Sequence, residues 1–556
     1  MPSPTTTPVL IVGGGPVGLT LSILLSAQGV DHLLVEARTD SSPHPKARGI
    51  SARSMEIFRR CGVEAAIRER ALPASHVSFY RGRDLVDPDF VRTGVAADRA
   101  EGPEHTPSPG VVCSQDLLEP LLRHRARELA ADRIRLGVRL LSFEQTADEG
   151  AGPGVRAVLQ DRDGGEPYQV TADWLIGCDG AASTVRTGAG LAMTGPTGLR
   201  HFLSIRFDAP LGAVVADRAS TSYFLTPPGL GGFLAIDNDR RWVYQYPFDP
   251  AVPGPHQDLT DHRRLAELVR TMAGLPELDV TIHSTMTWRM DARLADDYRR
   301  GRVLLAGDAA HLTPPTGGHG MNTGIGDADN LAWKLAAVTA GLGAPALLDS
   351  YQAERRPVAR QVIELSSENA RARAQGGGYR MDDELLLTAA YRSSAVIDDG
   401  GLADEAQDAQ DAQEAQEAQE ASEASEWLPL GLAGYRPSGA PGRRLPHARL
   451  AGPPGVGSTL DLVGPGFVLL TPHDDPAWRQ QADAAAAGGH PVTVHALDSG
   501  PLREAEPGAV GRLCGLPPTG ALLVRPDGHI GWRAGRPSRP GELLDVLRRI
   551  LGSTQA

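Results

Sequence analysis

Cysteine is scarce in this chain of 556 residues, since there are four and no two of them form a CxxC pair or stand at a metal-ligand spacing. We interpret them as reduced core thiols of a soluble, cytoplasmic protein. Long apolar runs are also lacking, and none reaches the ~18 residues that span a bilayer. The N-terminus has no basic segment before its apolar run, which argues against a signal peptide. The four cysteines are Cys61, Cys113, Cys178 and Cys514.

Positive charge is in deficit as well, because the formal net charge is -13. This argues against nucleic acid as a partner, since neutralising phosphates requires clustered Lys and Arg. Nine acids and no base stand between residues 404 and 426. Ala-Gln-Asp and then Ala-Gln-Glu repeat there with a period of three, so residues 401–426 are predicted to be an acidic low-complexity linker without chemistry. The remainder is only mildly acidic, and its charge says little about a substrate.

What the chain does have, at its very start, is a strand, a glycine turn and a helix. The apolar residues 9–12 run into the sequence GGGPVG at residues 13–18. In such a turn Gly13 permits the sharp bend, Gly15 lets backbone approach a pyrophosphate, and Gly18 lets helix and strand pack closely. The N-terminus of the following helix offers free N–H groups and a partial positive charge to phosphates. The motif predicts a dinucleotide site, with a ligand-free tight turn as the alternative.

A second strand at residues 33–35 ends on Glu36 and Ala37, about 20 residues further along. A carboxylate at this position can accept a hydrogen bond from a ribose 2′-OH and would repel a 2′-phosphate. NADP is therefore disfavoured at this site. FAD and NAD both remain open on this motif alone.

Two further strands end in an acid. Residues 174–178 are followed by Asp179, and residues 303–306 are followed by Gly307 and Asp308. Open α/β sheets bind ligands at the carboxyl ends of their strands, and Asp308 is suited to bond a ribityl hydroxyl. The glycine-rich residues 314–324 then lead into a long helix and can offer backbone N–H groups to a pyrophosphate and a flavin ring.

These three motifs, in this order, resemble those of the flavoprotein aromatic hydroxylases typified by para-hydroxybenzoate hydroxylase. The closest branch is the bacterial aromatic polyketide hydroxylases. Three more segments are similar to that family: residues 45–48 with 53–56, Gln115 with residues 118–119, and residues 351–357. The resemblance covers roughly residues 8–365. The C-terminal part looks like the thioredoxin-like domain of the polyketide branch but lacks a CxxC pair, which argues against dithiol activity.

The implied fold is α/β. A Rossmann-like FAD-binding domain takes residues 1–198 and 290–400, with an inserted antiparallel β-sheet substrate domain at 199–289. The linker leads to a thioredoxin-like α/β domain at residues 427–556. The spacing of apolar residues predicts strands at residues 201–207, 232–236, 242–246, 467–470, 492–495 and 521–524. It predicts helices at residues 326–339 and 541–551.

The resemblance also implies roles for single residues. Arg48 and Gln115 would hold the pyrophosphate or ribityl region of the flavin, and Asp179 would act near the pyrophosphate and the nicotinamide, more structurally than directly. Pro315 and the backbone of residues 317–322 would line the isoalloxazine. Arg53 would be catalytic at the flavin's reactive face, with a helix-surface or ion-pair arginine as the alternative. The residues implied to bind the cofactor are Gly13, Gly15, Pro16, Gly18, Glu36, Ala37, Arg48, Gln115, Asp179, Gly180, Asp308, Pro315, Gly318, Gly320, Met321 and Asn322.

His311 and His319 could suggest a metal, but no carboxylate or cysteine stands at ligand spacing, so no metal is expected. Trp333 and Lys334 are interpreted as helix packing and a solvated charge. Candidate walls of a substrate pocket are Phe202, Phe224, Phe233, Trp242, Tyr244 and Trp288, although an aromatic residue at strand spacing is more often plain core.

The implied activity is that of an FAD-dependent monooxygenase. NADPH or NADH binds transiently and reduces the flavin, O2 adds at C4a, and the hydroperoxide hydroxylates an electron-rich ring. No arginine clamp for a small carboxylate substrate is identifiable, which favours a large polycyclic phenol or quinone. Membrane partners are not expected, and a homodimer is left open.

Three other functions stay open. A Baeyer–Villiger oxygenase would use the same fold to insert oxygen beside a ketone, and an FAD-dependent dehydrogenase or reductase would avoid oxygen. A flavin-binding regulatory protein would instead use residues 401–556 as its working part. Deleting that part should leave an enzyme with its flavin and some turnover, whereas a binding protein should lose its partner.

Overall fold

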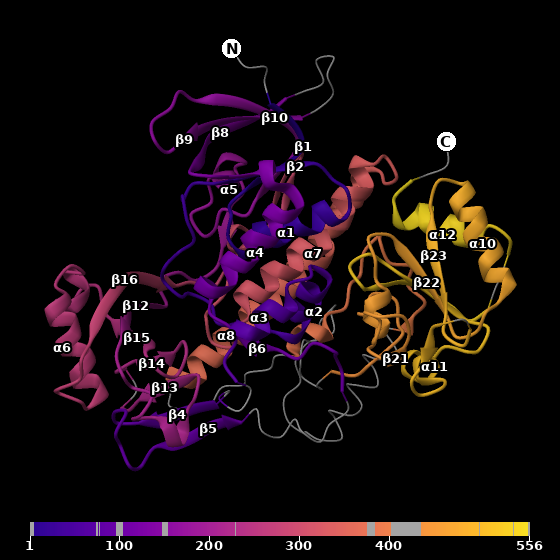
Figure 1. Cartoon of the computed structure of the whole chain (residues 1–556). Helices are drawn as coiled ribbons and strands as arrows, with labels where there is room; N and C mark the ends of the chain where they lie inside the picture. Colours follow the sequence, from indigo (N-terminus) through magenta and orange to yellow (C-terminus); the bar gives the residue numbers. More distant parts are fainter. Residues whose placement is uncertain are drawn as a thin grey trace.

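The computed structural model of the chain describes residues 5–73, 76, 78–95, 104–146, 154–227, 229–374, 384–401, 435–499, 501–536 and 539–553. Figure 1 shows three parts: a central sheet with helices, a second sheet to one side, and a C-terminal α/β unit on the other. The predicted acidic linker, from residue 402 onward, lies outside the described residues.

The central part contains an eight-stranded sheet, five strands of which run parallel in the order β7-β2-β1-β10-β19. Val9, Leu10 and Ile11 are fully buried, as expected in a parallel sheet covered on both faces. The parallel strands are β1 (Thr5–Val12), β2 (His32–Glu36), β7 (Ile134–Leu136), β10 (Tyr168–Gly177) and β19 (Val303–Leu305). The antiparallel additions are β18 (Arg299–Arg300), β8 (Val138–Thr146) and β9 (Gly154–Asp161).

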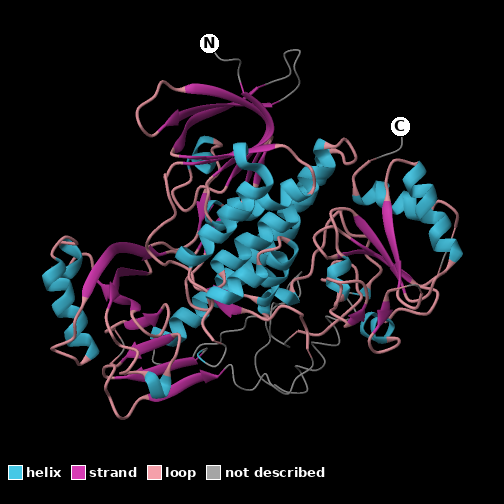
Figure 2. Cartoon of the chain, viewed as in Figure 1, coloured by secondary structure: helices cyan, strands magenta, loops and turns pink. Residues whose placement is uncertain are grey.

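Helices α1, α4 and α7 lie side by side against this sheet, with α8 alongside α7 (Figures 1 and 2). Helix α1 starts with Pro16, whose fixed φ and missing N–H suit the first helical position. Helix α7 starts at Gly320, six residues before the start predicted from the sequence. The helices here are α1 (Pro16–Ala27), α2 (Ala52–Arg60), α3 (Glu64–Arg70), α4 (Gln115–Ala130), α5 (Thr184–Gly188), α7 (Gly320–Thr339) and α8 (Asp349–Ala374).

The second sheet has seven strands, and the three strands predicted within it are present. One boundary is corrected, because β4 and β5 precede residue 199 and join this sheet through a parallel pairing of β4 with β13. Helix α6 (His262–Ala273) covers one face (Figure 1). In sheet order the strands are β16 (Thr281–Met290), β12 (Arg200–Asp208), β15 (Arg241–Phe248), β14 (Gly232–Ala235), β13 (Ser222–Leu225), β4 (Ser78–Gly82) and β5 (Val91–Val95).

The C-terminal part is a four-stranded mixed sheet with helices, and its three predicted strands and its last helix are present. Trp333 of α7 packs edge-on against Phe467 of β22 and belongs to the apolar core of this part. The predicted packing role of Trp333 is thus confirmed. The elements are β23 (Val492–Ala496), β22 (Phe467–Thr471), β25 (Ala521–Val524), β26 (Ile530–Ala534), α10 (Pro476–Ala487), α11 (Ala509–Cys514) and α12 (Glu542–Ile550).

Short pairings complete the fold. They are β3 (Gly49–Ile50) with β6 (Val111–Val112), β17 (Arg293–Ala295) between β11 (Met193–Thr194) and β20 (His311–Leu312), and β21 (Leu450–Ala451) with β24 (Arg503–Glu504).

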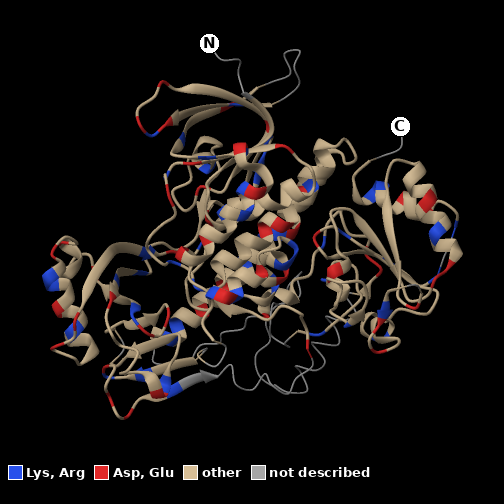
Figure 3. Ribbon diagram, in the orientation of Figure 1, with Lys and Arg blue, Asp and Glu red and all other residues tan. Residues whose placement is uncertain are grey.

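The prediction that Lys334 is a solvated charge is wrong. Its side chain is 0% exposed, and its Nζ lies 2.7 Å from Oε2 of Glu354 on α8. The C-terminal part covers this region of α7, which is why the side chain has no path to water. Figure 3 shows acidic and basic residues side by side on these central helices.

Candidate active site

The four strand ends predicted to bind a dinucleotide meet at one edge of the central sheet. Val12 pairs with Val35 and Gly177, and Gly177 pairs with Leu305, so β1, β2, β10 and β19 end level. The backbone hydrogen bonds continue past the strands, with the N–H of Gly13 donating to Val35 and that of Ala306 to Gly177. The polar and glycine residues gathered at this edge are Gly13, Glu36, Asp179 and Asp308.

The three glycines of the first turn are required for different reasons. Gly13 has φ +112°, and a Cβ on it would lie 2.2 Å from the carbonyl oxygen of Cys178. A Cβ on Gly18 would lie 2.0 Å from the carbonyl oxygen of Gly13. A Cβ on Gly15, just before Pro16 at the start of α1, would meet no described atom within 4 Å. Protein packing thus explains Gly13 and Gly18, whereas the open space at Gly15 fits the close approach of a phosphate.

Two carboxylates shape the turns beside this cradle. Glu36 accepts from the N–H of Gly14 at 2.6 Å and from that of Arg38 at 2.9 Å, across Ala37. Asp179 accepts from Ser183 Oγ at 2.5 Å and from the N–H of Val185 at 3.0 Å, and so organises the start of α5. These bonds give Asp179 a structural role in the turn after β10, and its role near the pyrophosphate and the nicotinamide stays a prediction.

Gly180 follows Asp179 with φ +81°, and a Cβ there would meet no described atom within 4 Å. The turn after β10 is therefore open on the same edge as the turn after β1. An elongated ligand can lie against backbone at both places.

Asp308 has a polar group that the described chain leaves unsatisfied. Its side chain is exposed, and its carboxylate has no hydrogen-bond partner among the described residues. Protein atoms crowd around it, and the resulting desolvation raises the pKa of its carboxyl. Because the side chain is exposed, a hydroxyl-rich ligand such as a ribityl chain has access to this carboxylate and can donate to it, so the residue fits a bound FAD.

His311, on β20, is held by an acid on α7. Its Nε2 lies 2.8 Å from Oδ2 of Asp327, which also accepts from the N–H of Gly307 at 3.1 Å. Arg355 donates to the other oxygen of Asp327 at 2.8 Å. This buried group fixes the turn that carries Asp308. Within the described ranges, no set of three or more His, Cys, Asp and Glu is placed to hold a metal ion.

The glycine-rich loop enters α7 through two residues with positive φ, Gly317 at +113° and Gly318 at +73°. A Cβ on Gly318 would meet no described atom within 4 Å. Asn322 fastens the loop, donating to the carbonyls of Gly318 at 2.7 Å and Gly49 at 3.0 Å. Next to it on α7, Gly320 and Met321 form the first turn.

Gln115 and Arg48 brace the segment that faces this loop. Gln115 accepts from the N–H of Ala47 at 3.3 Å and donates to Glu119 at 2.6 Å. Arg48 donates to the carbonyls of Thr221 at 2.8 Å and Ala235 at 2.9 Å. These bonds of Arg48 tie the central part to the second sheet, and a contact of either side chain with FAD stays a prediction.

Arg53 occupies a different place from the one expected. Its guanidinium lies 3.2 Å from Glu56, 3.0 Å from Asp329 and 2.6 Å from the carbonyl oxygen of Asp527 in the C-terminal part. The side chain is buried among these acceptors. The contacts are those of the ion-pair arginine given as the alternative, here at a domain junction, and a catalytic role of Arg53 stays an untested prediction.

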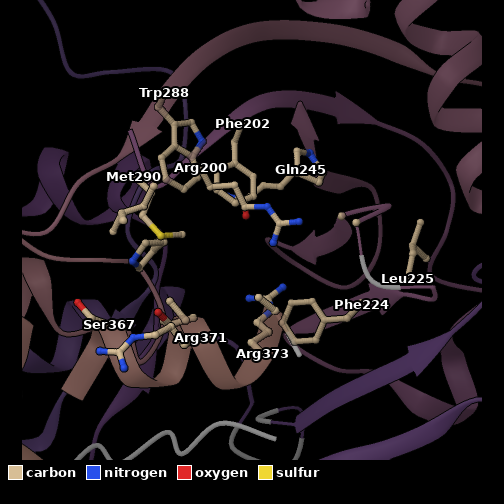
Figure 4. A pocket seen from close by; sticks show the side chains of 18 of the residues that line it. Arg200, Phe202, Phe224, Leu225, Gln245, Trp288, Met290, Ser367, Arg371 and Arg373 are labelled. Atoms are coloured by element: carbon tan, nitrogen blue, oxygen red, sulfur yellow. The ribbon is translucent and has the colours of Figure 1, made fainter. Parts of the chain in front are cut away.

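A cavity of about 450 Å³ lies between the second sheet and the end of α8 (Figure 4). This volume is within the ~300–1,000 Å³ typical of small-molecule sites. Pro315 and Thr316 of the glycine-rich loop form part of its wall, and Thr316 Oγ1 donates to the Ser366 carbonyl of α8 at 2.7 Å. The cavity therefore borders the loop predicted to line a flavin ring.

Aromatic side chains from the sheet form one wall of the cavity. Phe202 and Trp288 stack with ring centroids 4.4 Å apart, and Phe224 lies on another side. These three were among the six candidate walls. The other three, Phe233, Trp242 and Tyr244, are fully buried and belong to the core of the sheet domain.

The charged residues of this cavity are not predictable from local sequence patterns. Its lining includes four arginines, Arg81, Arg200, Arg371 and Arg373. They come from separate strands and one helix, so no linear motif contains them. The one usable signal was that Arg200 and Phe202, two apart on a strand, share a face.

A dinucleotide cradle with open space for a phosphate, joined by one loop to an aromatic cavity, fits a flavin-dependent enzyme that acts on a ring substrate. Residues 6–366 match the family described as "FAD binding domain". Residues 438–554 match "Aromatic-ring hydroxylase, C-terminal". The chain belongs to the FAD-dependent aromatic-ring hydroxylases. FAD is its cofactor, and NAD(P)H is the electron donor typical of these enzymes.

Characterised relatives match over nearly the whole chain. Tetracenomycin B2 monooxygenase-dioxygenase of Streptomyces olivaceus is 36% identical over 98% of this chain and 99% of its own. Aklavinone 12-hydroxylase RdmE of Streptomyces purpurascens is 35% identical over 98% of both chains.

Two solved structures agree with the fold. The flavin-dependent monooxygenase PieE, in complex with FAD and substrate, superposes with a TM-score of 0.85 at 31% identity, covering 99% of this chain and all of its own. Aklavinone-11 hydroxylase with FAD and aklavinone superposes with a TM-score of 0.83 at 33% identity, covering 98% and 99%. Across the described residues, no helix combines the length and apolarity needed to cross a bilayer.

Proposed function

We propose that this hydroxylase acts on a polycyclic aromatic substrate, with O2 as co-substrate and NADPH or NADH as donor. The observation that carries the proposal is the cavity between the second sheet and α8, with the Phe202–Trp288 stack on one side and Pro315 on the other. A flat ring system gains most from such a wall, since stacked rings add ~0.5–1.5 kcal/mol beyond the area they bury. The ligands named for the relatives are consistent with such a substrate.

The residues proposed to bind FAD lie at the carboxyl edge of the central sheet. Gly13, Gly15, Pro16 and Gly18 would receive the pyrophosphate at the start of α1, and Glu36 would accept from the ribose. Gly180 and Asp308 would face the ribityl region, and the backbone from Pro315 to Asn322 would line the ring. Bound FAD supplies electron transfer and oxygen activation.

The protein's own part in the chemistry is positioning and exclusion of water. The loop at Pro315 and Thr316 is fastened to α8 and α7, so one wall of the cavity is fixed relative to the cofactor site. A substrate stacked on Phe202 and Trp288 is oriented toward that wall. Holding two reactants in register in this way replaces an encounter in solution by a preorganised one.

The purified, FAD-loaded protein tests this proposal. We expect polycyclic phenols to accelerate both NAD(P)H and O2 consumption, and the product to gain one oxygen atom as a hydroxyl. A ring oxygen in the product would indicate Baeyer–Villiger chemistry instead. If every ring compound leaves consumption unchanged while an added acceptor is reduced without O2, a dehydrogenase replaces the hydroxylase.

Three finer assignments belong to the same proposal. The C-terminal domain is proposed to be thioredoxin-like, supported by a parallel β22–β23 pair beside antiparallel β25 and β26. The free thiols of the four cysteines support a reducing, cytoplasmic location. A homodimer is testable by light scattering of the purified protein.

A further inference from the structure

The turn that carries Asp308 packs tightly against both helices that begin at the cofactor edge. A Cβ on Gly307, which has φ +63°, would lie 2.9 Å from Cγ2 of Val17 in the first turn of α1. A Cβ on Gly324 of α7 would lie 2.6 Å from the same atom and 3.0 Å from Cα of Gly307. Packing thus fixes the place of the turn, while hydrogen bonds hold its orientation.

These hydrogen bonds converge on Asp327. Its Oδ2 accepts from the N–H of Gly307 at 3.1 Å and lies 2.8 Å from Nε2 of His311, so one oxygen holds the turn on both sides of Asp308. Neither Asp327 nor His311 has exposed side-chain surface. Burial opposes ionisation of Asp327, but the charges of His311 and Arg355 outweigh it and lower the pKa of its carboxyl. A buried anion therefore stands directly behind the exposed carboxylate of Asp308.

Arg355 of α8, the second partner of Asp327, is itself held by Tyr391. Its Nη1 donates to the hydroxyl oxygen of Tyr391 at 2.9 Å. Tyr391 stands between residues 6–366 and residues 438–554, the two ranges that match family models. The Tyr391 ring stacks on His529 of the C-terminal part, with ring centroids 4.1 Å apart. A continuous line of contacts thus runs from the C-terminal part through α8 and α7 to the turn beside the cofactor site.

We propose that Asp327 is a positioning residue for FAD: it orients the turn that presents Asp308 to the ribityl chain, and Tyr391 completes its hydrogen-bond network from a segment beyond α8. This rests on the proposed function, in which Asp308 faces the ribityl region. Because Asp327 is fully buried, it acts through Asp308 and not by contact with the ligand. A functional group must be held within ~0.5 Å of its productive place, which packing of the turn alone does not achieve for a side chain in the open.

A double-mutant cycle in the full-length, FAD-loaded protein tests whether Asp327 acts through Asp308. Dilution releases FAD, and the fluorescence of the released FAD gives its dissociation constant. We expect Asp308→Ala and Asp327→Asn each to raise this constant at least roughly tenfold. The double variant should bind FAD no more weakly than Asp308→Ala alone, because no carboxylate is left for the turn to orient. The visible circular dichroism of the bound flavin should change in the same direction in both single variants.

Asp329→Asn is the matched control. Asp329 lies two residues further along α7, is equally buried and is also paired with an arginine, its Oδ2 lying 3.0 Å from Arg53 at the junction with the C-terminal part. The same chemical change should therefore destabilise the protein through a buried ion pair. It should leave the FAD dissociation constant within about twofold of the wild type.

Should Asp327→Asn fail to fold, Tyr391→Phe takes its place in the cycle. It removes only the hydroxyl that holds Arg355, and we expect the FAD dissociation constant to rise roughly threefold. Tyr298→Phe is its control, because the buried Tyr298 hydroxyl has no hydrogen-bond partner among the described residues. That variant should bind FAD as the wild type does.

Three results would overturn the proposal. The fold-changes of Asp308→Ala and Asp327→Asn could multiply in the double variant, which would make the two residues independent. Asp329→Asn could weaken FAD binding as much as Asp327→Asn, which would indicate a general loss of stability. Asp308→Ala could hold FAD as tightly as the wild type, which would remove the proposed ribityl contact. Failure of the hydroxylase proposal is separate, since it appears as absence of ring-stimulated O2 uptake while the FAD cycle is still measured.

Discussion

Arg525 in the C-terminal domain forms two parallel hydrogen bonds with Glu354 of α8, Nη1 to Oε1 at 2.7 Å and Nη2 to Oε2 at 2.8 Å, with neither side chain exposed. Lys334 of α7 contacts the same carboxylate. Burial opposes ionisation of Glu354, but the charges of Arg525 and Lys334 outweigh it and hold the pKa of that carboxyl well below its usual range. The C-terminal domain thus completes the charge balance of the FAD-binding domain.

Removing Arg525 from this buried ion pair should strongly destabilise the folded protein. In Arg525→Met the buried carboxylates of Glu354 and Asp527 lose their shared partner, and we expect the free energy of unfolding to fall by ~3–5 kcal/mol. Urea denaturation measures it. The control is Arg512→Met in the same domain, whose partner Glu506 is exposed, with an expected loss of at most ~1 kcal/mol. Equal, small losses in both variants would contradict a structural role for the buried pair.

The same junction changes the outcome expected for a truncated chain. The sequence alone suggested that a chain lacking residues 401–556 keeps its flavin. In the structure that deletion would uncover Trp333, Lys334 and Glu354, which include a fully buried ion pair. We therefore expect the truncated protein to aggregate or to purify without FAD, as seen by size-exclusion chromatography and the flavin-to-protein absorbance ratio. A monodisperse yellow truncation product would show that the two domains are energetically independent.

Gly15 provides a test of the cofactor cradle that separates ligand from packing. A Cβ there meets no described atom within 4 Å, so Gly15→Ala should fold with an unchanged thermal midpoint in the FAD-free form. It should hold FAD at least roughly tenfold more weakly, because the methyl group occupies the space where the pyrophosphate approaches. Gly464→Ala, whose Cβ also meets nothing, is the control for a general effect of the substitution. Retention of FAD by Gly15→Ala would place the pyrophosphate elsewhere.

The parts of the site that sequence predicted are those carried by consecutive residues. The glycine turn at residues 13–18 and the strand ending before Asp308 are local patterns, and each lies at the expected edge of the sheet. Arg53 shows which contacts local sequence patterns do not predict. Its pairing with Glu56 is local, but Asp329 and the Asp527 carbonyl lie 276 and 474 residues away and give it a junction role. The arginines of the cavity were missed for the same reason, since only tertiary structure brings them together.

Trp288 lines the cavity, whereas other aromatic residues of the same sheet pack only in its core. It stacks on Phe202 and donates from Nε1 to Ser204 Oγ at 2.9 Å, while its ring lines the cavity. We expect Trp288→Ala to raise the KM for a polycyclic substrate roughly tenfold, with a smaller change in kcat, because the stacking surface is lost. Steady-state kinetics at saturating NADPH measures this.

Phe233→Ala is the companion variant, since Phe233 is fully buried in the core of the same domain. It should cost ~3–5 kcal/mol of stability through the cavity it leaves, with KM unchanged in the folded fraction. If instead both variants raise KM equally, the distinction between wall and core residues is wrong.

His44 makes stability depend on pH at the contact between the FAD-binding domain and the second sheet. Its Nδ1 lies 3.0 Å from Ser284 Oγ of β16, and its side chain is buried. Desolvation, aided by the charges of Lys46 and Arg206 and opposed by Asp116, lowers the pKa of His44 from 6.5 to about 4. Between these two values the unfolded chain binds more protons than the folded one, so the stability of the protein falls as the pH drops from 6.5 toward 4.

Replacing the histidine should remove that slope. From pH 7 to pH 5, His44 should account for a loss of about 2 kcal/mol in the free energy of unfolding, and His44→Gln should lack this part of the decline because its amide does not titrate. Urea denaturation at the two pH values, on protein loaded with FAD, measures the difference. His124→Gln removes a histidine whose side chain is 77% exposed and is the control. Parallel pH profiles for the wild type and His44→Gln would mean that the imidazole is protonated in the folded protein with Ser284 as an acceptor, and the buried contact would then have to tolerate a charge.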